Sequence, residues 1–325
     1  MTETPVASAP TGERPTLPSA LDAIGHTPLV PLRRLVPPGS ARVLMKLEYF
    51  NPTGSYKDRM ARAMIEEAER RGQISPERTT IVEYTGGSTG SSLSFVCAVK
   101  GYPLRIVSSD AFSEEKLRTM TSLGAELLIV PSDGGRITPD LMPRIIDRTR
   151  ELATGAGIYW TDQFNNPDNA VGQRTLGREI LEQTGGKVDA FVVSVGTAGC
   201  AMGVAYELKK HDRDIRVEVV EPSTSAVISG GAAGSHRVEG IALGFVPPLL
   251  DPDLYDEVVV VEEDEARLMV RRLATEEGIF AGTSSGMNVV AALRAAARLG
   301  PDATVVTAAV DSGLKYISTD LYPKR

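Results

Sequence analysis

The sequence predicts an α/β protein built on two open, twisted and mostly parallel sheets that are flanked by helices. Short apolar runs of strand length alternate with amphipathic helical patterns along most of the 325 residues, as parallel βα folds require. Several helical patterns also end at a glycine, for instance Gly72, Gly101 and Gly124, which is a common C-terminal stop. A chain of this length is expected to form about two domains.

The first series of elements extends to about residue 160. Its strands are short apolar runs, and its helices repeat apolar residues at helical spacing. We expect strands at Val43–Glu48, Thr80–Glu83, Leu104–Ser108 and Glu126–Val130, and helices at Asp58–Arg71, Thr89–Lys100, Ser113–Leu123 and Met142–Thr154.

The second series has the same alternation and contains the most apolar strands of the chain. We expect strands at Ala190–Ser194, Arg216–Val220, Glu257–Val261 and Thr304–Ala309, and helices at Ala170–Gln183, Ala201–His211, Glu263–Glu277 and Ser285–Leu299.

The change of series near Tyr159–Asn169 is interpreted as the crossover between two lobes. Residues 1–19 are rich in proline, threonine, serine and alanine, and we expect them to be a disordered tail. The N-terminal lobe is expected over 41–160, and the C-terminal lobe over 20–40 together with 161–325. Ligands in such folds lie at the carboxyl ends of the strands, so the active site is expected between the lobes.

Composition argues against two classes of partner. The 42 acidic residues outnumber the 35 lysines and arginines, which gives a net charge of −7, and no nucleic-acid partner is expected. Apolar stretches such as Ala190–Val195 are strand-sized and far below the roughly 20 residues that span a bilayer. Residues 1–19 also lack the pattern of a secretory signal, so no membrane partner is expected.

Cysteine and histidine usage predicts the compartment and argues against a metal site. The chain has two cysteines, Cys97 and Cys200, in apolar or glycine-rich settings, which suggests reduced thiols in the cytoplasm. Its three histidines, His26, His211 and His236, are scattered, so no metal is expected.

Lys57 lies in the turn-forming segment Asn51–Arg59, just before the first long helical pattern. Thr53 or Ser55 can cap that helix, which places Lys57 in its first turn. A cation there meets the positive end of the helix dipole, an unfavourable interaction of roughly 0.3–1 kcal/mol. The same field would lower the pKa of the amine, as a Schiff-base lysine requires. Taken alone, the segment favours the alternative of a solvated lysine on a helix face.

Three further loops, rich in glycine and hydroxyl groups, each lead into a helical pattern: Glu83–Ser92, Ser194–Gly203 and Gly278–Gly286. The first offers backbone amides and hydroxyls to a carboxylate at a helix N-terminus, although a merely tight turn is the alternative. The second offers oriented N–H groups to a phosphate without a basic residue, and it lacks the ending of a nucleotide P-loop. The serines of the third, taken singly, are ordinary N-caps.

Together, the four segments resemble the cysteine synthase/cystathionine β-synthase family of fold-type II enzymes. These enzymes use pyridoxal 5′-phosphate and share the fold of the tryptophan synthase β-subunit. The matching motifs are Asn-Pro-Thr-Gly-Ser-x-Lys-Asp-Arg, Thr-Gly-Gly-Ser-Thr-Gly, Gly-Thr-x-Gly and Gly-x-Ser-Ser-Gly. The resemblance begins at Ile24–Val30 and ends at Asp311–Thr319, so it covers nearly the whole chain after the tail.

The resemblance implies a role for each matching residue. Lys57 would form the internal aldimine and later act as base and acid at the substrate α-carbon. The residues implied to bind the cofactor are Lys57, Ser88, Gly196, Thr197, Ala198, Gly199, Cys200 and Ser284. The residues implied to bind the substrate carboxylate are Thr85, Gly86, Gly87, Ser88, Thr89 and Gln163. A mobile part of the N-terminal lobe would close over the substrate, and the C-terminal lobe would hold the cofactor phosphate.

Ser284 matches the hydroxyl that meets the pyridine nitrogen, and a neutral group there favours loss of a β-substituent over transamination. Asp58 and Arg59 are expected to be structural. Two residues depart from the family pattern: Ser88 replaces an asparagine that touches the phenolic oxygen of the ring, and Cys200 replaces a threonine. A thiol is a weaker donor than a hydroxyl, so substrate or nucleophile preference could differ from that of ordinary cysteine synthases.

The resemblance therefore implies β-replacement on an O-activated L-serine, in which sulfide or another small nucleophile adds to an aminoacrylate. Two alternatives stay open: β-elimination, of the serine/threonine dehydratase or cysteine desulfhydrase type, and a non-catalytic relative that binds a partner. The implied substrate is a small amino acid, and the implied setting is amino-acid biosynthesis by a cytoplasmic homodimer.

Overall fold

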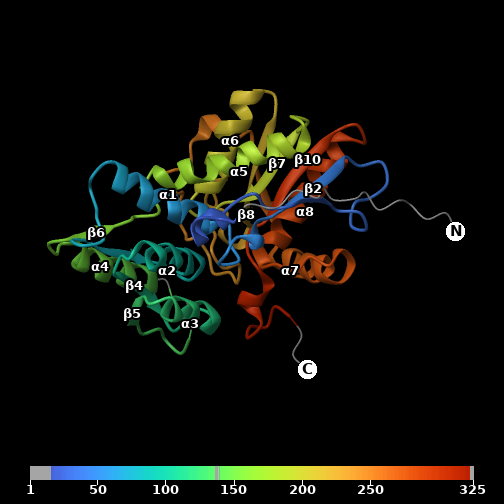
Figure 1. Cartoon of the computed structure of the whole chain (residues 1–325). Coiled ribbons are helices and arrows are strands. Elements are labelled where there is room, and N and C mark those ends of the chain that lie inside the picture. The colour runs from blue at the N-terminus through green and yellow to red at the C-terminus, as the bar shows by residue number, and fades with distance from the viewer. Residues whose placement is uncertain (1–15, 136–137, 139, 323–325) are drawn as a thin grey trace.

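The computed structural model describes residues 16–135, 138 and 140–322. Figure 1 shows two sheets, each with helices on both faces, and nearly all strand pairs in them are parallel. The predicted fold class is confirmed. Most of the predicted tail, residues 1–15, lies outside the described residues. Within the described ranges, no helix combines the length and the apolar content that a membrane crossing needs.

The six-stranded sheet has the order β1-β2-β10-β7-β8-β9. Its strands are β1 (Leu29–Pro31), β2 (Arg42–Leu47), β10 (Thr304–Ala309), β7 (Ala190–Ser194), β8 (Arg216–Pro222) and β9 (Glu257–Val261), of which β1 alone is antiparallel to its neighbour. Side chains alternate along β7: Val192 packs toward the core cluster that includes α8, whereas Phe191 packs toward the cluster that includes α6. Helices α5 (Asp168–Thr184) and α6 (Gly199–His211) cover one face, and α7 (Glu263–Arg272) and α8 (Thr283–Leu299) cover the other (Figure 1).

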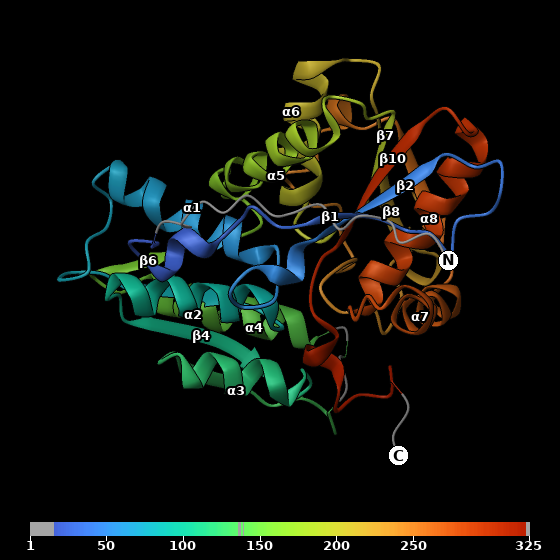
Figure 2. The ribbon, with the colours of Figure 1, turned by 45° about the vertical axis from the view of Figure 1, so that its right-hand side comes forward.

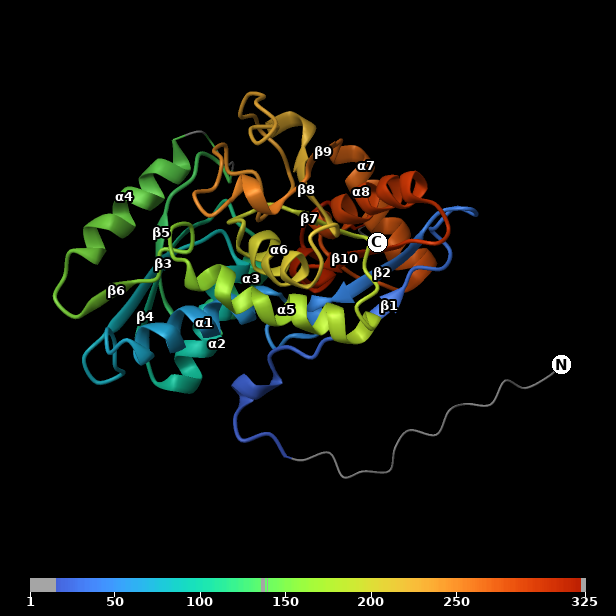
Figure 3. The same ribbon diagram turned by 90° about the horizontal axis from the view of Figure 1, so that it is seen from above.

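The four-stranded sheet has the order β5-β4-β3-β6 and is wholly parallel. Its strands are β5 (Glu126–Val130), β4 (Leu104–Ser109), β3 (Thr80–Tyr84) and β6 (Ile158–Trp160). Figure 3 shows α1 (Lys57–Arg70) and α2 (Ser88–Lys100) on one side of this sheet and α4 (Leu141–Ala153) on the other. Helix α3 (Glu114–Ser122) lies with α1 and α2, since its Met120 belongs to their core cluster.

The predicted elements are present, with three differences. The three-residue strands β1 and β6 were not predicted, because segments so short carry no alternation of apolar and polar residues. The C-terminal part of the helix predicted at Glu263–Glu277 is a π-helical turn over Leu273–Glu277. Residues 42–47, assigned above to the N-terminal lobe, pair with β10 and β1 and so belong to the six-stranded sheet. The remaining lobe boundaries stay a prediction.

Helix α5 connects the two halves of the fold by packing closely against both α1 and α6. A Cβ added to Gly172 would lie 2.5 Å from the backbone oxygen of Arg59 in α1. A Cβ added to Gly203 of α6 would lie 2.3 Å from the backbone oxygen of Ala170 in α5. Glycine is therefore required at both crossings, and the helix that carries Lys57 is held against the helices of the six-stranded sheet.

Candidate active site

Lys57 is the first residue of α1 and is buried, with 6% of its surface exposed. Its backbone N–H donates to Ser55 Oγ at 3.2 Å, and its Nζ lies 4.9 Å from the centre of the Tyr56 ring. Burial lowers the pKa of Lys57 from 10.5 to about 8, against the opposing effect of nearby acidic groups that include Asp311. The solvated-lysine alternative is wrong, because Lys57 is buried and burial is the main cause of its lowered pKa.

The turn before α1 is supported by Asp58 and not by a capping threonine. The Thr53 backbone N–H and hydroxyl donate to the two oxygens of the Asp58 carboxylate, at 2.8 and 2.5 Å. No side chain caps α1, although Ser55 accepts one N–H. Thr53 therefore orients Asp58 across the turn, and the expectation that Asp58 is structural is confirmed.

Arg59 connects the start of α1 to both neighbouring elements through buried ion pairs. Its guanidinium lies 2.8 Å from Glu48 Oε2 and 2.6 Å from Glu179 Oε1, and Lys46 Nζ lies 2.7 Å from Glu179 Oε2. These cations hold the pKa of Glu179 at about 2, although burial opposes the shift. The expected structural role of Arg59 is confirmed, because the network fixes the position of α1 relative to β2 and α5.

The loop before α2 ends in a helix start that no side chain caps. The first N–H group of α2 that has an acceptor within the helix is that of Ser91, which donates to Gly87 O at 3.0 Å. The backbone N–H groups of the three preceding residues therefore have no intrahelical acceptor. Thr89 Oγ1 donates to Gln163 Oε1 at 2.7 Å, and Gln163 Nε2 donates to Tyr84 O at 2.9 Å. The structure thus places Gln163 against the loop, as the predicted site requires.

Two glycines of this loop have no room for a side chain. A Cβ on Gly86 would lie 2.7 Å from the Phe112 ring, and a Cβ on Gly87 would lie 2.1 Å from Lys116 Cδ. Both contacts come from the segment that leads into α3 or from α3 itself. The glycines therefore allow this segment to cover the loop.

The loop before α6 is a second helix start without a side-chain cap. Its N-cap, Ala198, has a left-handed backbone with φ of 67°, and the first intrahelical bond runs from Met202 N to Ala198 O at 2.9 Å. The N–H groups of Gly199, Cys200 and the next residue are consequently open. Burial raises the pKa of the Cys200 thiol to about 12, so it is neutral at physiological pH. An uncapped helix start with a neutral side chain suits an anion.

Ser284 lies in the first turn of α8, and 3% of its surface is exposed. Its hydroxyl has no hydrogen-bond partner among the residues that the structure describes, whereas the neighbouring Ser285 Oγ accepts from Val310 N at 3.0 Å. The Ser284 hydroxyl is therefore available to a ligand.

Asp311, which directly follows Val310 at the end of β10, contacts three of these loops. Its backbone pairs with Ser55 in the Lys57 turn, and its carbonyl accepts from Gly282 N at 3.2 Å. Its Oδ2 accepts from Ser88 Oγ at 3.4 Å and from Tyr316 Oη at 2.7 Å. Its Oδ1 is buried without a partner in the described structure. The sequence analysis assigned Asp311 no role, although a carboxylate directly after a buried strand was a usable signal.

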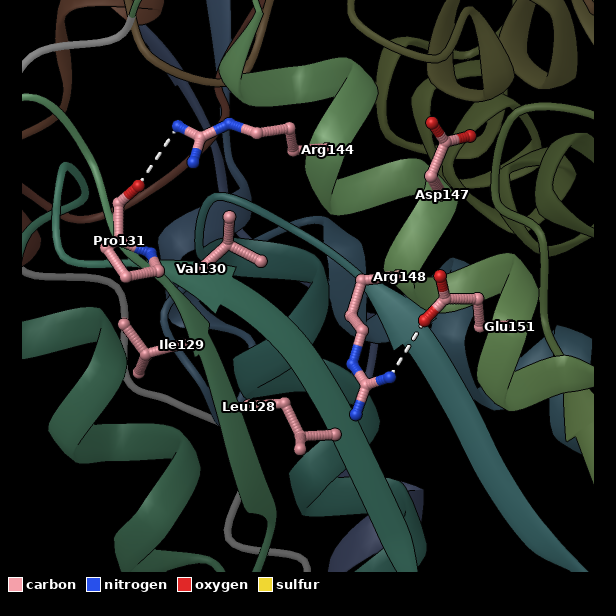
Figure 4. A pocket seen from close by; sticks show the side chains of 8 residues that line it. All are labelled: Leu128, Ile129, Val130, Pro131, Arg144, Asp147, Arg148 and Glu151. Carbon is pink, nitrogen blue, oxygen red and sulfur yellow. Dashed lines mark hydrogen bonds and ion pairs between the residues drawn. The ribbon is translucent and has the colours of Figure 1, made fainter.

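A hollow of about 480 Å³ lies between β5 and α4, away from these loops (Figure 4). An Arg148–Glu151 ion pair of 2.8 Å and a hydrogen bond from Arg144 to Pro131 O border it. None of the predicted site residues lines it. In the described part of the chain, no cluster of histidine, cysteine and acidic residues could hold a metal ion.

Residues 20–311 match the family model described as "Pyridoxal-phosphate dependent enzyme". The chain belongs to this family. Its relatives include a cysteine synthase of Staphylococcus aureus, 44% identical over 92% of this chain and 95% of that protein. A probable cysteine synthase of Bacillus subtilis is 42% identical over 93% of this chain and 96% of that protein.

Solved structures agree with the family assignment. A cysteine synthase of Entamoeba histolytica superposes with a TM-score of 0.91 at 34% identity, covering 99% of this chain and 95% of the other. An O-ureido-L-serine synthase superposes with a TM-score of 0.85 at 38% identity, covering 94% and 95%. The resemblance to cysteine synthases is confirmed, and the chain is a pyridoxal-phosphate-dependent enzyme of the cysteine synthase type.

Proposed function

We propose that this enzyme catalyses β-replacement on O-acetyl-L-serine, with sulfide as the nucleophile and Lys57 as the lysine that binds the cofactor covalently. The observation that supports this most directly is the position of Lys57. Its buried amine has a pKa of about 8 and interacts electrostatically with Asp311, which belongs to a different segment of the candidate site. Retention of such a lysine also argues against a non-catalytic relative.

The residues present fit pyridoxal 5′-phosphate. The open N–H groups at the start of α6 and the neutral thiol of Cys200 would take its phosphate, and the unpartnered hydroxyl of Ser284 would face its ring nitrogen. When bound, the cofactor supplies an electron sink for the electrons released at the substrate α-carbon. Because Ser284 is neutral, this site favours loss of a β-substituent over transamination.

The start of α2 would bind the substrate α-carboxylate. Its three open N–H groups and the Thr85 hydroxyl offer donors, and Gln163 is held beside the loop by Thr89. Phe112 and Lys116 cover the glycines of this loop and so limit the access of water. These groups orient the substrate with its α-carbon toward Lys57.

Lys57 Nζ would take the proton from the substrate α-carbon. An amine with a pKa of about 8 is partly neutral just above neutral pH, which is what a general base requires. After the leaving group has departed and the nucleophile has added at the β-carbon, the same nitrogen returns the proton. One group can serve both steps because it does not move away from the reacting carbon.

The relatives favour replacement over β-elimination, since cysteine synthases match nearly the whole chain at 42–44% identity. We also propose, from the family and the composition, that the enzyme acts in the cytoplasm as a homodimer in amino-acid biosynthesis.

The test combines absorbance with product analysis. Protein loaded with cofactor should show a visible band that Lys57→Ala loses, and that Lys57→Arg also loses although it keeps the charge. With O-acetyl-L-serine, cysteine should form only when sulfide is present. Pyruvate as the dominant product with and without sulfide would refute replacement, and no visible band in the loaded wild type would refute the enzyme assignment.

A further inference from the structure

A second cation lies beside the substrate loop and has no role in the function proposed above. We propose that Lys315, together with Ser88, binds an oxyanion distinct from the substrate α-carboxylate. One of the two reactants of this enzyme, the amino acid or the nucleophile, would therefore carry a second anionic group. This inference rests on the proposed function and specifies its substrate class.

Lys315 lies between the Lys57 turn and the start of α2. It belongs to the short 3-10 helix Gly313–Tyr316 that follows β10, and Figure 2 shows this part of the chain next to the end of α3. Its Nζ donates to Ser88 Oγ at 3.4 Å, and its Cε lies 3.7 Å from the position of a Cβ on Gly54. The amine is thus directed at the edge of the candidate active site, and only 9% of the residue is exposed.

The buried ammonium of Lys315 has no carboxylate within 4 Å among the described residues, whereas the buried cations Lys46, Arg59 and Lys116 each have one. Lys116, on the other side of the loop, is bonded to Glu239. The acids whose charge acts on Lys315 bond to other groups: Asp58 accepts two bonds from Thr53, and Asp311 Oδ2 accepts from a tyrosine and from Ser88, which leaves only Asp311 Oδ1 without a partner in the described structure. A buried, unpaired charge is costly, and a ligand oxyanion would remove that cost.

Ser88 orients the ammonium for such a ligand. Its hydroxyl accepts from Lys315 and donates to Asp311, so it holds Nζ at the edge of the site. Burial lowers the pKa of Lys315 to about 8, so the amine is still largely protonated near neutral pH. An ammonium with three donors, of which only one is used by Ser88, suits a phosphate, sulfate or thiosulfate group.

Two reactants could bring this group. As the leaving group, it would be the phosphate of O-phospho-L-serine. With sulfide, the Cβ–O bond breaks, phosphate leaves with the bonding electrons and a Cβ–S bond forms, giving L-cysteine and phosphate without an oxidant. As the nucleophile, it would be thiosulfate, whose terminal sulfur forms the Cβ–S bond while acetate leaves O-acetyl-L-serine.

The experiment uses the loaded enzyme and two arms. The first compares kcat/KM for O-phospho-L-serine and O-acetyl-L-serine, both with sulfide. The second compares thiosulfate and sulfide, both with O-acetyl-L-serine. In at least one arm, Lys315→Met should lower kcat/KM for O-phospho-L-serine or thiosulfate by about tenfold or more relative to the other reactant of the same arm. A loss of this size is expected when one charged hydrogen bond is removed. Lys315→Arg should retain most of the preference.

Lys116→Met is the matched control, because it removes the same charge from the other side of the substrate loop, but from an amine already bonded to Glu239. It should change both reactants of an arm alike. Equal effects of Lys315→Met on both reactants in both arms, or no effect, would overturn the inference while the β-replacement assignment stands. The visible band of each variant shows that the cofactor is still bound, so loss of folding cannot be mistaken for loss of preference.

Discussion

Replacing Lys57 by methionine should make the cofactor-free protein more stable near neutral pH. Burial lowers the pKa of Lys57 from 10.5 to about 8 in the folded chain. Between these two values the unfolded state binds the additional proton, so stability rises with pH across this window, and the penalty is complete below about 8. A shift of this size corresponds to about 3 kcal/mol.

Methionine has an unbranched side chain of similar length and carries no charge, so it keeps most of the packing and removes the penalty. Urea denaturation of cofactor-free wild type and Lys57→Met, at about pH 7 and at about pH 10, measures the effect. We expect the variant to be more stable at the lower pH and the difference to shrink at the higher one.

The control is Lys187→Met, which removes a lysine that is exposed and should therefore show no such pH-dependent difference. If Lys57→Met is less stable than the wild type at about pH 7, or if the difference does not change with pH, burial is not the dominant influence on this amine. The argument that the site holds Lys57 ready as a base would then fail.

Three further predictions concern the loops and their support. Gly87→Ala brings a Cβ to 2.1 Å from Lys116 Cδ, so it should displace that lysine and raise the KM for O-acetyl-L-serine by about tenfold; an unchanged KM would contradict the close packing. Arg59→Met leaves the buried Glu48 carboxylate without a cation and Glu179 with Lys46 alone, and it should cost about 3–5 kcal/mol of unfolding free energy, measured by denaturation. The control Arg62→Met removes a half-buried pair and should cost less than about 1 kcal/mol; equal losses would argue against the buried network. Ser284→Asp should reduce cysteine formation by roughly tenfold or more at equal cofactor content, because a carboxylate at the ring nitrogen favours competing chemistry; unchanged rates would place the ring elsewhere.

The order and type of the long elements were predictable from local pattern. Strands such as Ala190–Ser194 are continuous apolar runs, and helices such as Thr89–Lys100 end at glycine, so short-range physics was sufficient. The glycine-rich loops were found for the same reason, since each combines turn residues with a helix start. Three-residue strands such as β6 carry too little pattern to be recognised.

The sequence by itself determined the fold class, the family and the four loops, because these depend on residues that are neighbours along the chain. Tertiary structure decided which distant residues meet those loops. Gln163 lies against Thr89, Asp311 accepts from Ser88, and Lys315 reaches the same hydroxyl, across separations that no local spacing encodes. It also decided why the pKa of Lys57 is low. The helix dipole can be anticipated from the start of a helix, but burial, which lowers this pKa, depends on what the rest of the chain packs around the amine.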